Sequence, residues 1–190
     1  MARTPSTMPE LGGPAPDFSL PDVVTGRGVS LDDFRDAKAV LVAFWCNHCP
    51  FVIHIEDAFV DFAREYLPKG VEIVAINAND AEAYPADSPA EMKVRANERD
   101  YPFPYLFDES QEVAKAFQAA CTPDFFLYDP SGALVYRGQF DGSRPGNGVP
   151  VSGEDLRAAA NALLAGRPIA EVQNPSMGCN IKWRPGNEPG

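Results

Sequence analysis

The stretch from Ala39 to Pro50, which reads Ala-Val-Leu-Val-Ala-Phe-Trp-Cys-Asn-His-Cys-Pro, carries the strongest structural signal in the chain. Its first seven residues are apolar without interruption, which is typical of a strand buried on both faces of a parallel sheet. After Pro50 the apolar residues recur at helical spacing, at Phe51, Ile55, Phe59, Phe62 and Tyr66. Cys46 and Cys49 are therefore predicted to lie where a central strand gives way to a helix.

Such a junction suits a reactive thiolate. The free N–H groups and the positive dipole end at a helix N-terminus stabilise the deprotonated sulfur. A Cys-x-x-Cys pair in a strand-to-helix turn therefore indicates a redox dithiol. The alternative is half of a zinc site, but such sites usually show a second close pair of ligands. Cys121 and Cys179 are isolated, so we favour the dithiol and expect no metal and no other cofactor.

The composition limits the class of protein. A chain of 190 residues, 45% hydrophobic and 23% charged, fits one globular domain. The formal net charge of −11 argues against nucleic acid and anionic membrane surfaces as partners. No apolar stretch approaches the roughly 18 residues of a membrane helix, and residues 1–16 lack the apolar centre of a secretory signal. These features predict a cytoplasmic protein, where a cysteine pair is more often catalytic than structural.

The rest of the chain alternates between strand and helix patterns. Further strands are predicted at 71–77, 102–107, 124–128 and 133–139, and further helices at 88–101, 111–119 and 152–164. This alternation predicts an α/β fold, in which helices cover both faces of a central mixed β-sheet. We expect a flexible lead over residues 1–14, a domain over residues 15–168, and a tail over residues 169–190 packed on that domain.

The motif Phe44-Trp45-Cys46-Asn47-His48-Cys49 resembles the thioredoxin-like superfamily and, within it, the redoxins of AhpC/TSA type. The segments 101–105, 141–148 and 176–183 resemble a redoxin group called peroxiredoxin-like 1. The resemblance implies a thioredoxin-like fold with an N-terminal hairpin and an irregular C-terminal tail.

The resemblance implies a thiol–disulfide oxidoreductase. Cys46 would attack a disulfide of a protein or small molecule, and Cys49 would resolve the mixed disulfide. An unidentified electron donor would complete the cycle. Trp45, Asn47 and His48 would support the dithiol. His48 could stabilise a thiolate, or it could simply face solvent.

Three further positions are candidates for the site. Thr122-Pro123 resembles the cis-proline loop of thioredoxin-like proteins, whose cis bond would leave the backbone of Thr122 free to pair with a peptide substrate. Cys121 could be a third redox thiol near Cys46, although a small buried hydrophobe is the favoured interpretation. Cys179 could resolve a sulfenate if the tail folds back, or it could be inert.

Some positions depart from the family pattern. Peroxiredoxins place Pro-x-x-x-Thr before the peroxidatic cysteine, and here those two positions hold Ala39 and Ala43. This argues against a thiol peroxidase, which stays an alternative beside a non-catalytic redox sensor or binding module. The buried acid of thioredoxins is replaced by Val40, which leaves Asp124 as a candidate proton acceptor. Arg137 and Arg144 could position an anion, but surface placement is favoured.

Overall fold

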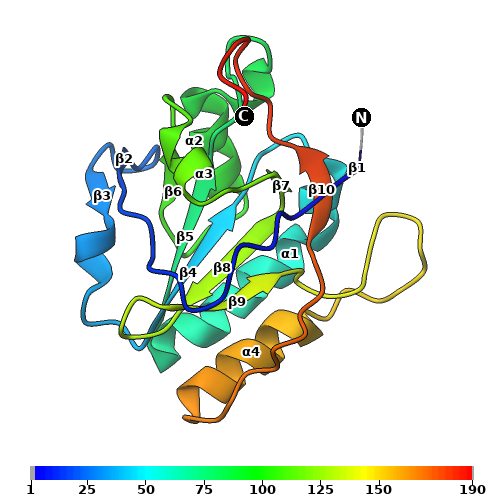
Figure 1. Cartoon of the computed structure of the whole chain (residues 1–190). Helices are drawn as coiled ribbons and strands as arrows, with labels where there is room; N and C mark the ends of the chain where they lie inside the picture. The colour runs from blue at the N-terminus through cyan, green and yellow to red at the C-terminus, as the bar shows by residue number, and fades with distance from the viewer. Residues whose placement is uncertain (1–2, 190) are drawn as a thin grey trace.

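The computed structural model describes residues 3–189 of the chain (Figure 1). Its centre is a five-stranded sheet in the order β6-β5-β4-β8-β9. These strands are β6 (Tyr105–Phe107), β5 (Val71–Asn77), β4 (Ala39–Phe44), β8 (Asp124–Tyr128) and β9 (Leu134–Gly138). β4 is the middle strand, and it pairs in parallel with β5 and antiparallel with β8. The predicted mixed sheet, with this apolar run at its centre, is confirmed.

Side chains of β4 point alternately into two apolar cores, which is the period of a strand. Leu41 and Ala43 belong to the core under α1, α2 and α4, whereas Val40, Val42 and Phe44 belong to the core on the other face. The helices of the first face are α1 (Pro50–Tyr66), α2 (Pro89–Glu98) and α4 (Glu154–Leu164).

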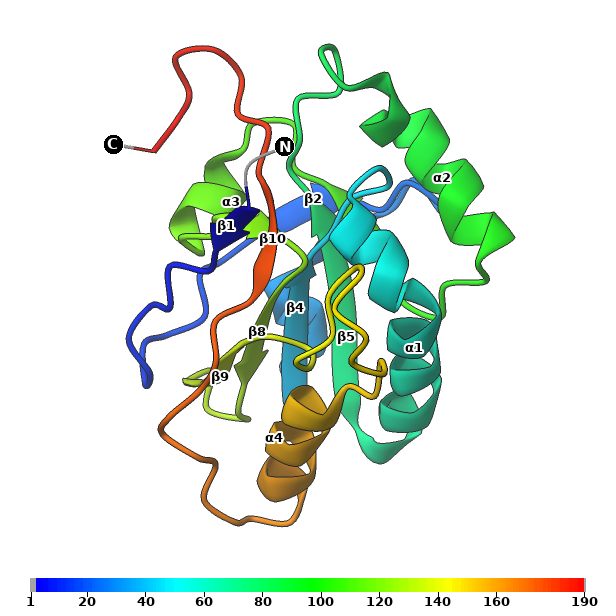
Figure 2. The ribbon, with the colours of Figure 1, turned by 90° about the vertical axis from the view of Figure 1, so that its right-hand side faces the viewer.

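The opposite face of the sheet has a different cover. It consists of α3 (Glu112–Ala116), the last residues of the tail, and the hairpin of β2 (Ser19–Pro21) and β3 (Gly28–Ser30). Figure 2 shows α1 and α2 on one side of the sheet and α3 on the other. Both faces of the central strand are therefore sealed, which explains why β4 reads as an unbroken apolar run.

Local sequence signals explain most helix ends. Ser88 caps α2 by accepting a hydrogen bond from the Glu91 N–H, and Pro89 occupies the first helical position. Ser30 and Asp33 form a capping box on the short helix η1 (Leu31–Phe34). α1 runs into the short helix η2 (Leu67–Lys69), which Gly70 ends in a left-handed conformation with φ of 97°. A third short helix, η3 (Pro85–Asp87), precedes α2.

A second sheet joins three segments that lie far apart in the sequence. β10 (Met177–Asn180) pairs antiparallel with β1 (Arg3–Pro5) on one side and with β7 (Cys121–Thr122) on the other (Figure 1). The tail, expected to be irregular, therefore contains one strand, and that strand needs partners which no local pattern reveals.

This second sheet also bears on the expected domain division. Within the flexible lead predicted at residues 1–14, Arg3–Pro5 has a defined place on the tail, and the Gly12 N–H donates to the Leu134 carbonyl. The boundaries at residues 14 and 168 stay a prediction. None of the helices within residues 3–189 has both the length and the apolar content to cross a membrane.

Candidate active site

The two motif cysteines lie at the carboxyl end of β4, at the point where the chain turns into α1. Cys49 is the N-cap residue of α1, and Pro50 occupies the first turn of that helix. No side chain in the described residues caps this end by a hydrogen bond. The pKa of Cys49 is lowered chiefly by the Cys46 thiol, and the Val52 N–H acts in the same direction.

Neither cysteine reaches the surface. The exposed fraction is 1% for Cys46 and 0% for Cys49. Both thiols are therefore closed off from solvent. The physical reason is that the Thr122-Pro123 loop and β10 lie over the junction, and both come from distant parts of the chain.

Thr122 contacts both sulfur atoms of the motif. Its hydroxyl oxygen is 3.1 Å from Cys46 Sγ, and its carbonyl oxygen is 3.1 Å from Cys49 Sγ. The Thr122–Pro123 peptide bond is cis, as the resemblance implies. The expectation that the Thr122 backbone is free for a peptide substrate is wrong, however. Thr122 pairs with Cys179 in the ladder between β7 and β10.

Asn47 fixes the turn between the cysteines. Its backbone N–H donates to Asp87 Oδ1 at 2.7 Å, and its side-chain amide donates to the Ala86 carbonyl at 2.8 Å. The Tyr105 hydroxyl donates to Asn47 Oδ1 at 3.1 Å. Asn47 thus attaches the motif to η3 on one side and to β6 on the other, in agreement with its predicted supporting place.

His48 is held by the same carboxylate. Its Nδ1 lies 2.6 Å from Asp87 Oδ2, and its ring stacks on Tyr84 with centroids 5.5 Å apart. The hydrogen bond to Asp87 raises the pKa of His48, although burial opposes this. Its buried Nε2 has no hydrogen-bond partner among residues 3–189. The raised pKa favours the protonated imidazolium, which would place positive charge near the dithiol.

Asp87 is fully buried and nonetheless suited to be an anion. Burial alone would raise the pKa of Asp87, but the hydrogen bonds from His48, from Asn79 Nδ2 and from the Asn47 N–H together lower it. The Asn79 bond is 2.8 Å long. Asp87 therefore organises the residues between the two cysteines.

Trp45, directly before Cys46, is fully buried. Its indole N–H donates to the Tyr101 hydroxyl at 3.0 Å, and that hydroxyl donates to Glu56 Oε1 at 2.6 Å. Glu56 is buried and receives a hydrogen bond from Arg95 Nε at 2.8 Å. These hydrogen bonds thus connect Trp45, at the end of β4, to α1 and α2.

The two remaining cysteines differ in their relation to the motif. Cys179 on β10 places its sulfur 2.9 Å from Cys49 Sγ. Cys121 on β7 is paired with Asn180, and its thiol donates to the Pro123 carbonyl at 3.6 Å. Burial raises the pKa of Cys121. The structure thus brings Cys46, Cys49 and Cys179 together, while the place of Cys121 agrees with a small buried side chain.

The three neighbouring thiols differ in pKa. A hydrogen bond from the Cys46 thiol lowers the pKa of Cys49 to about 5 against the effect of burial, and the Cys179 thiol contributes in the same direction. Burial raises the pKa of Cys46, and burial raises the pKa of Cys179 to about 12. Of the three thiols, Cys49 is therefore the one whose surroundings favour the thiolate.

Asp124, the candidate proton acceptor, begins β8 directly after Pro123. Its side chain is fully buried, and neither carboxylate oxygen has a hydrogen-bond partner in the described part of the chain. Burial raises the pKa of Asp124 to about 7. Arg137 and Arg144 are half-buried instead of exposed, and their guanidinium groups bond to backbone carbonyls and to Gln173 and Gln139.

Within residues 3–189, the donor atoms of Cys46, His48 and Asp87 all lie within 4.8 Å of one another, which is close enough to consider a metal ion. However, the 2.6 Å between His48 Nδ1 and Asp87 Oδ2 is a hydrogen-bond distance, shorter than the roughly 3.3 Å between two ligands of one zinc ion. The arrangement therefore fits a hydrogen bond between His48 and Asp87 better than two ligands of one metal ion.

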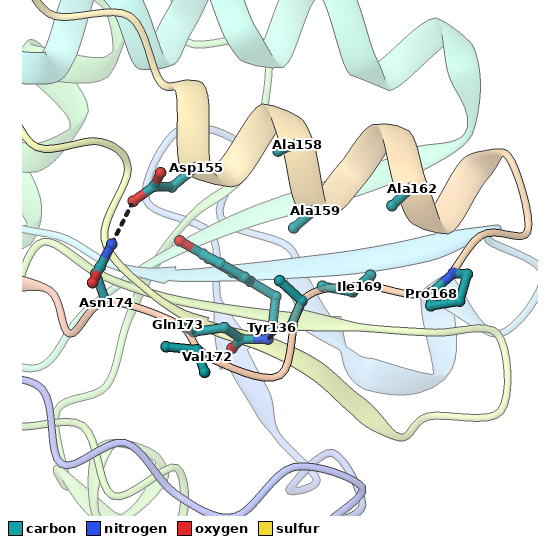
Figure 3. Close-up of a pocket in the computed structure, with 11 residues that line it drawn as sticks. Tyr136, Asp155, Ala158, Ala159, Ala162, Pro168, Ile169, Val172, Gln173 and Asn174 are labelled. Carbon is teal, nitrogen blue, oxygen red and sulfur yellow. Dashed lines mark hydrogen bonds between the residues drawn. The ribbon is translucent and has the colours of Figure 1, made fainter.

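A separate pocket of about 280 Å³ lies between α4 and the following tail (Figure 3). Its walls are Tyr136 from β9, small residues of α4 such as Ala158, Ala159 and Ala162, and the tail residues 168–174. No cysteine lines it, and its polar groups, Asp155 and Asn174, bond to each other at 3.4 Å. We assign no chemistry to this pocket.

The sequence did not identify Asp87, Asn79, Tyr101 or Tyr105 as part of the site. One signal could have indicated Asn79, which lies two residues after the end of β5, because the carboxyl ends of neighbouring parallel strands meet at the same edge of a sheet. Asp87 gave no such signal, since it precedes a capped helix and resembles an ordinary acidic loop residue.

Comparison with known proteins gives the site a context. A model of the AhpC/TSA family matches residues 11–137, which include both motif cysteines and the cis proline. The chain is 56% identical to an uncharacterized conserved protein from Geobacillus kaustophilus, whose crystal structure it matches with a TM-score of 0.96 over 98% of each chain.

A curated relative has a stated activity. The thiol-disulfide oxidoreductase ResA of Bacillus cereus is 26% identical over 126 residues, which cover 66% of this chain and 68% of ResA. Across the ResA relatives, the match spans between 62% and 70% of their own length.

The fold itself is shared more widely. A thiol:disulfide interchange protein of the thioredoxin family from Chlorobium tepidum superposes with a TM-score of 0.62 at 20% identity, over 82% of this chain and 99% of the other. The predicted thioredoxin-like α/β fold is thereby confirmed.

Proposed function

This chain belongs to the AhpC/TSA family, and on that basis we propose that it is a thiol–disulfide oxidoreductase whose exchanging dithiol is Cys46 and Cys49. The observation that carries the proposal is the contact of both sulfur atoms with Thr122, beside a cis proline and at the start of α1. The similarity to ResA supports the same reaction class. Its substrate would be a protein or small-molecule disulfide, and an unidentified donor would return the electrons, within the cytoplasm.

The reaction begins with transfer of the Cys46 proton to the Cys49 thiolate. Cys46 then attacks the substrate disulfide, one substrate sulfur leaves as a thiol with the proton from Cys49, and a mixed disulfide forms at Cys46. The regenerated Cys49 thiolate attacks the sulfur of Cys46, and the second substrate sulfur leaves as a thiolate. Two electrons pass from the dithiol to the substrate, and one proton goes with them. The low pKa of Cys49 makes this thiolate available at neutral pH.

Glutathione disulfide, a small-molecule disulfide, is a direct probe of this reaction. We expect the reduced wild type to release two glutathione molecules and to gain one intramolecular disulfide. Cys49→Ser should accumulate a mixed disulfide at Cys46, seen as one added glutathione by intact mass. Cys46→Ser should lose at least about 99% of turnover, because it lacks the attacking sulfur.

The outcomes separate the assigned roles. A mixed disulfide found on Cys49 in Cys46→Ser, with retained turnover, would reverse the roles of the two cysteines. Absence of any exchange in the wild type would contradict the enzyme itself and favour the non-catalytic sensor.

One observation favours a second candidate, the thiol peroxidase. The hydroxyl that Ala43 cannot supply is provided from another strand, since Thr122 Oγ1 lies 3.1 Å from Cys46 Sγ. A hydroxyl at that place could orient a peroxide while Cys46 attacks one peroxide oxygen and the other leaves as an alcohol or water. Cys49 would then displace water from the Cys46 sulfenate and form the disulfide.

Stopped-flow oxidation by hydrogen peroxide decides between the two candidates. For the oxidoreductase we expect a rate like that of an ordinary thiol, equal in the wild type, Thr122→Val and Thr122→Ser. Val keeps the shape of Thr and the backbone ladder but removes the hydroxyl, and Ser retains it. Fast wild-type oxidation that falls about tenfold or more in Thr122→Val and persists in Thr122→Ser would establish the peroxidase instead.

A further inference from the structure

β10 occupies the edge beside the dithiol. Its residues Cys179 and Asn180 pair antiparallel with Thr122 and Cys121, the two residues before Pro123. An extended peptide that binds a sheet edge adds itself as a strand by main-chain hydrogen bonds. Here that position is already filled by β10, a strand of the same chain that also contacts α1.

The fit between β10 and this edge depends on Gly178. A Cβ atom at Gly178 would stand 2.0 Å from the Thr122 carbonyl oxygen and 2.6 Å from its carbonyl carbon, so any other residue would push the strands apart. The backbone of Gly178 has no positive φ to explain the glycine. The absence of a side chain therefore serves the close approach of the tail to Thr122.

Hydrogen bonds hold β10 in place at both ends. Before the strand, the Ser6 N–H donates to the Ser176 carbonyl at 2.9 Å. After it, the Ile181 N–H donates to the Ala120 carbonyl at 3.1 Å, and the Lys182 N–H donates to Asn79 Oδ1 at 2.8 Å. β1 adds a ladder along the outer edge. Hydrogen bonds within the chain thus fix β10 beside the dithiol.

This strand presents one side chain to the dithiol. Cys179 Sγ lies 2.9 Å from Cys49 Sγ, and both residues are buried. A disulfide bond requires about 2.05 Å between the sulfur atoms, so a shift of roughly 1 Å suffices. Cys49 therefore has two sulfur neighbours, Cys46 through the motif and Cys179 through the tail.

We propose that β10 is a built-in substrate strand and that Cys179 is a third exchange thiol, which takes over the disulfide from Cys46–Cys49 to form Cys49–Cys179. The proposal rests on the proposed dithiol chemistry of Cys46 and Cys49. It assigns Cys179 a role in the same site, and it makes the covered Thr122 edge part of the reaction.

The transfer is an exchange within one molecule. Cys179 loses its proton, its sulfur attacks the Cys49 sulfur, the Cys46–Cys49 bond breaks, and Cys46 leaves as a thiolate that takes up the proton. No electron enters or leaves the protein, and one disulfide replaces another. The molecule stays oxidised by two electrons, but Cys46 is again a thiol and β10 is joined covalently to α1.

Peptide mapping after oxidation tests the transfer. The reduced protein is treated with one equivalent of glutathione disulfide, quenched in acid, alkylated with N-ethylmaleimide and digested with trypsin. A Cys46–Cys49 disulfide stays within the tryptic peptide 39–64, whereas a Cys49–Cys179 disulfide links that peptide to 158–182. We expect the linked peptide pair in the wild type, with Cys46 alkylated.

Three variants sharpen the test. Cys179→Ser should give only the Cys46–Cys49 disulfide, with alkylation of Cys46 in the oxidised protein reduced about tenfold or more. Gly178→Ala should shift the products in the same direction while it keeps all thiols, because β10 must move away from Thr122. Cys121→Ala, which removes a buried thiol outside the cluster, should match the wild type. Circular dichroism of each variant reports whether the fold is retained.

The results separate this proposal from the one on which it rests. A wild type that forms only Cys46–Cys49, with Cys46 equally protected in Cys179→Ser, would overturn the role of Cys179 and leave the oxidoreductase intact. Formation of neither disulfide would overturn both.

Discussion

Two buried carboxyl groups, one beside the motif and one at the start of β8, have very different surroundings. Asp87 and Asp124 are both 0% exposed. Asp87 accepts hydrogen bonds from the Asn47 N–H, His48 and Asn79, and their combined effect lowers its pKa. Asp124 has no hydrogen-bond partner within residues 3–189, and burial raises its pKa to about 7.

The comparison separates the effect of burial on a carboxyl pKa from the effect of hydrogen-bond donors. Equal burial would raise both pKa values, so the difference comes from the three donors that surround Asp87. Asp87 is thus an anion that fixes the turn of the motif, whereas Asp124 can take up or release a proton near neutral pH. The same substitution, Asp to Asn, should therefore have very different effects at the two positions.

The largest effect is expected for Asp87→Asn. The amide is neutral and turns its NH₂ group toward donors, which leaves buried N–H groups unpaired. We expect a loss of about 3 to 4 kcal/mol in the free energy of unfolding at pH 7, measured by urea denaturation. Glutathione disulfide turnover should also fall, because Asn47 and His48 lose their anchor. An unchanged midpoint would mean that Asp87 does not hold the turn.

Asp124→Asn should instead change how stability depends on pH. The folded-state pKa of Asp124, about 7, lies above its ordinary value of 3.8 in an unfolded chain, so the folded protein binds an extra proton between these values. This contribution to stability is present below pH 3.8 and is lost as the pH rises toward 7. From pH 4.5 to 6.5 the wild type should lose about 2 to 3 kcal/mol relative to Asp124→Asn, measured by urea denaturation. Parallel curves for the two proteins would show that Asp124 is ionised in the fold.

A smaller effect is expected for His48→Gln, which tests the partner of Asp87. The pKa of His48 is raised by Asp87, so its contribution to stability is complete below the ordinary histidine pKa of 6.5 and disappears as the pH rises through the raised value. The variant should be less stable by about 1 kcal/mol at pH 6 and closer to the wild type at pH 9. A deficit that is equal at both pH values would indicate a loss of packing on Tyr84 and not of charge.

The smallest effect is expected for Ser6→Ala. The Ser6 side chain lowers the pKa of Asp124 against the dominant effect of burial, without a hydrogen bond of normal geometry to either carboxylate oxygen. Its removal should raise the carboxyl pKa of Asp124 further, by an amount worth a few tenths of a kcal/mol, as followed by carbon NMR of the side chain. A lower pKa in the variant would show that Ser6 does not stabilise the carboxylate.

The sequence predicted well what depends on local pattern. The unbroken apolar run at Ala39–Phe44 and the helical spacing after Pro50 correspond to β4 and α1, and Ser88 caps α2 as expected. These features follow from periodicity and capping, which act within a few residues. The resemblance added the fold type and the cis bond before Pro123.

What the sequence could not predict depends on contacts between distant segments. Asp87 reaches the motif across 40 positions, and Cys179 reaches Cys49 across 130. The near-complete burial of Cys46 and the closed Thr122 edge follow from the same tail contacts. A segment as short as residues 177–180 shows no hydrophobic periodicity. Its pairing depends on the glycine at position 178 and on β1 and β7, which lie far away in the sequence.

The central position of β10 in its three-stranded sheet also has a consequence for biosynthesis. The sheet joins residues 3–5, 121–122 and 177–180, so it can form only after the last of these has been translated. The 130 positions between Cys49 and Cys179 correspond to roughly ten seconds of elongation. During that interval the nascent chain carries a complete dithiol without the strand that covers it. Chains released before residue 177 would retain the motif in an uncovered form, accessible to disulfides that the finished protein excludes.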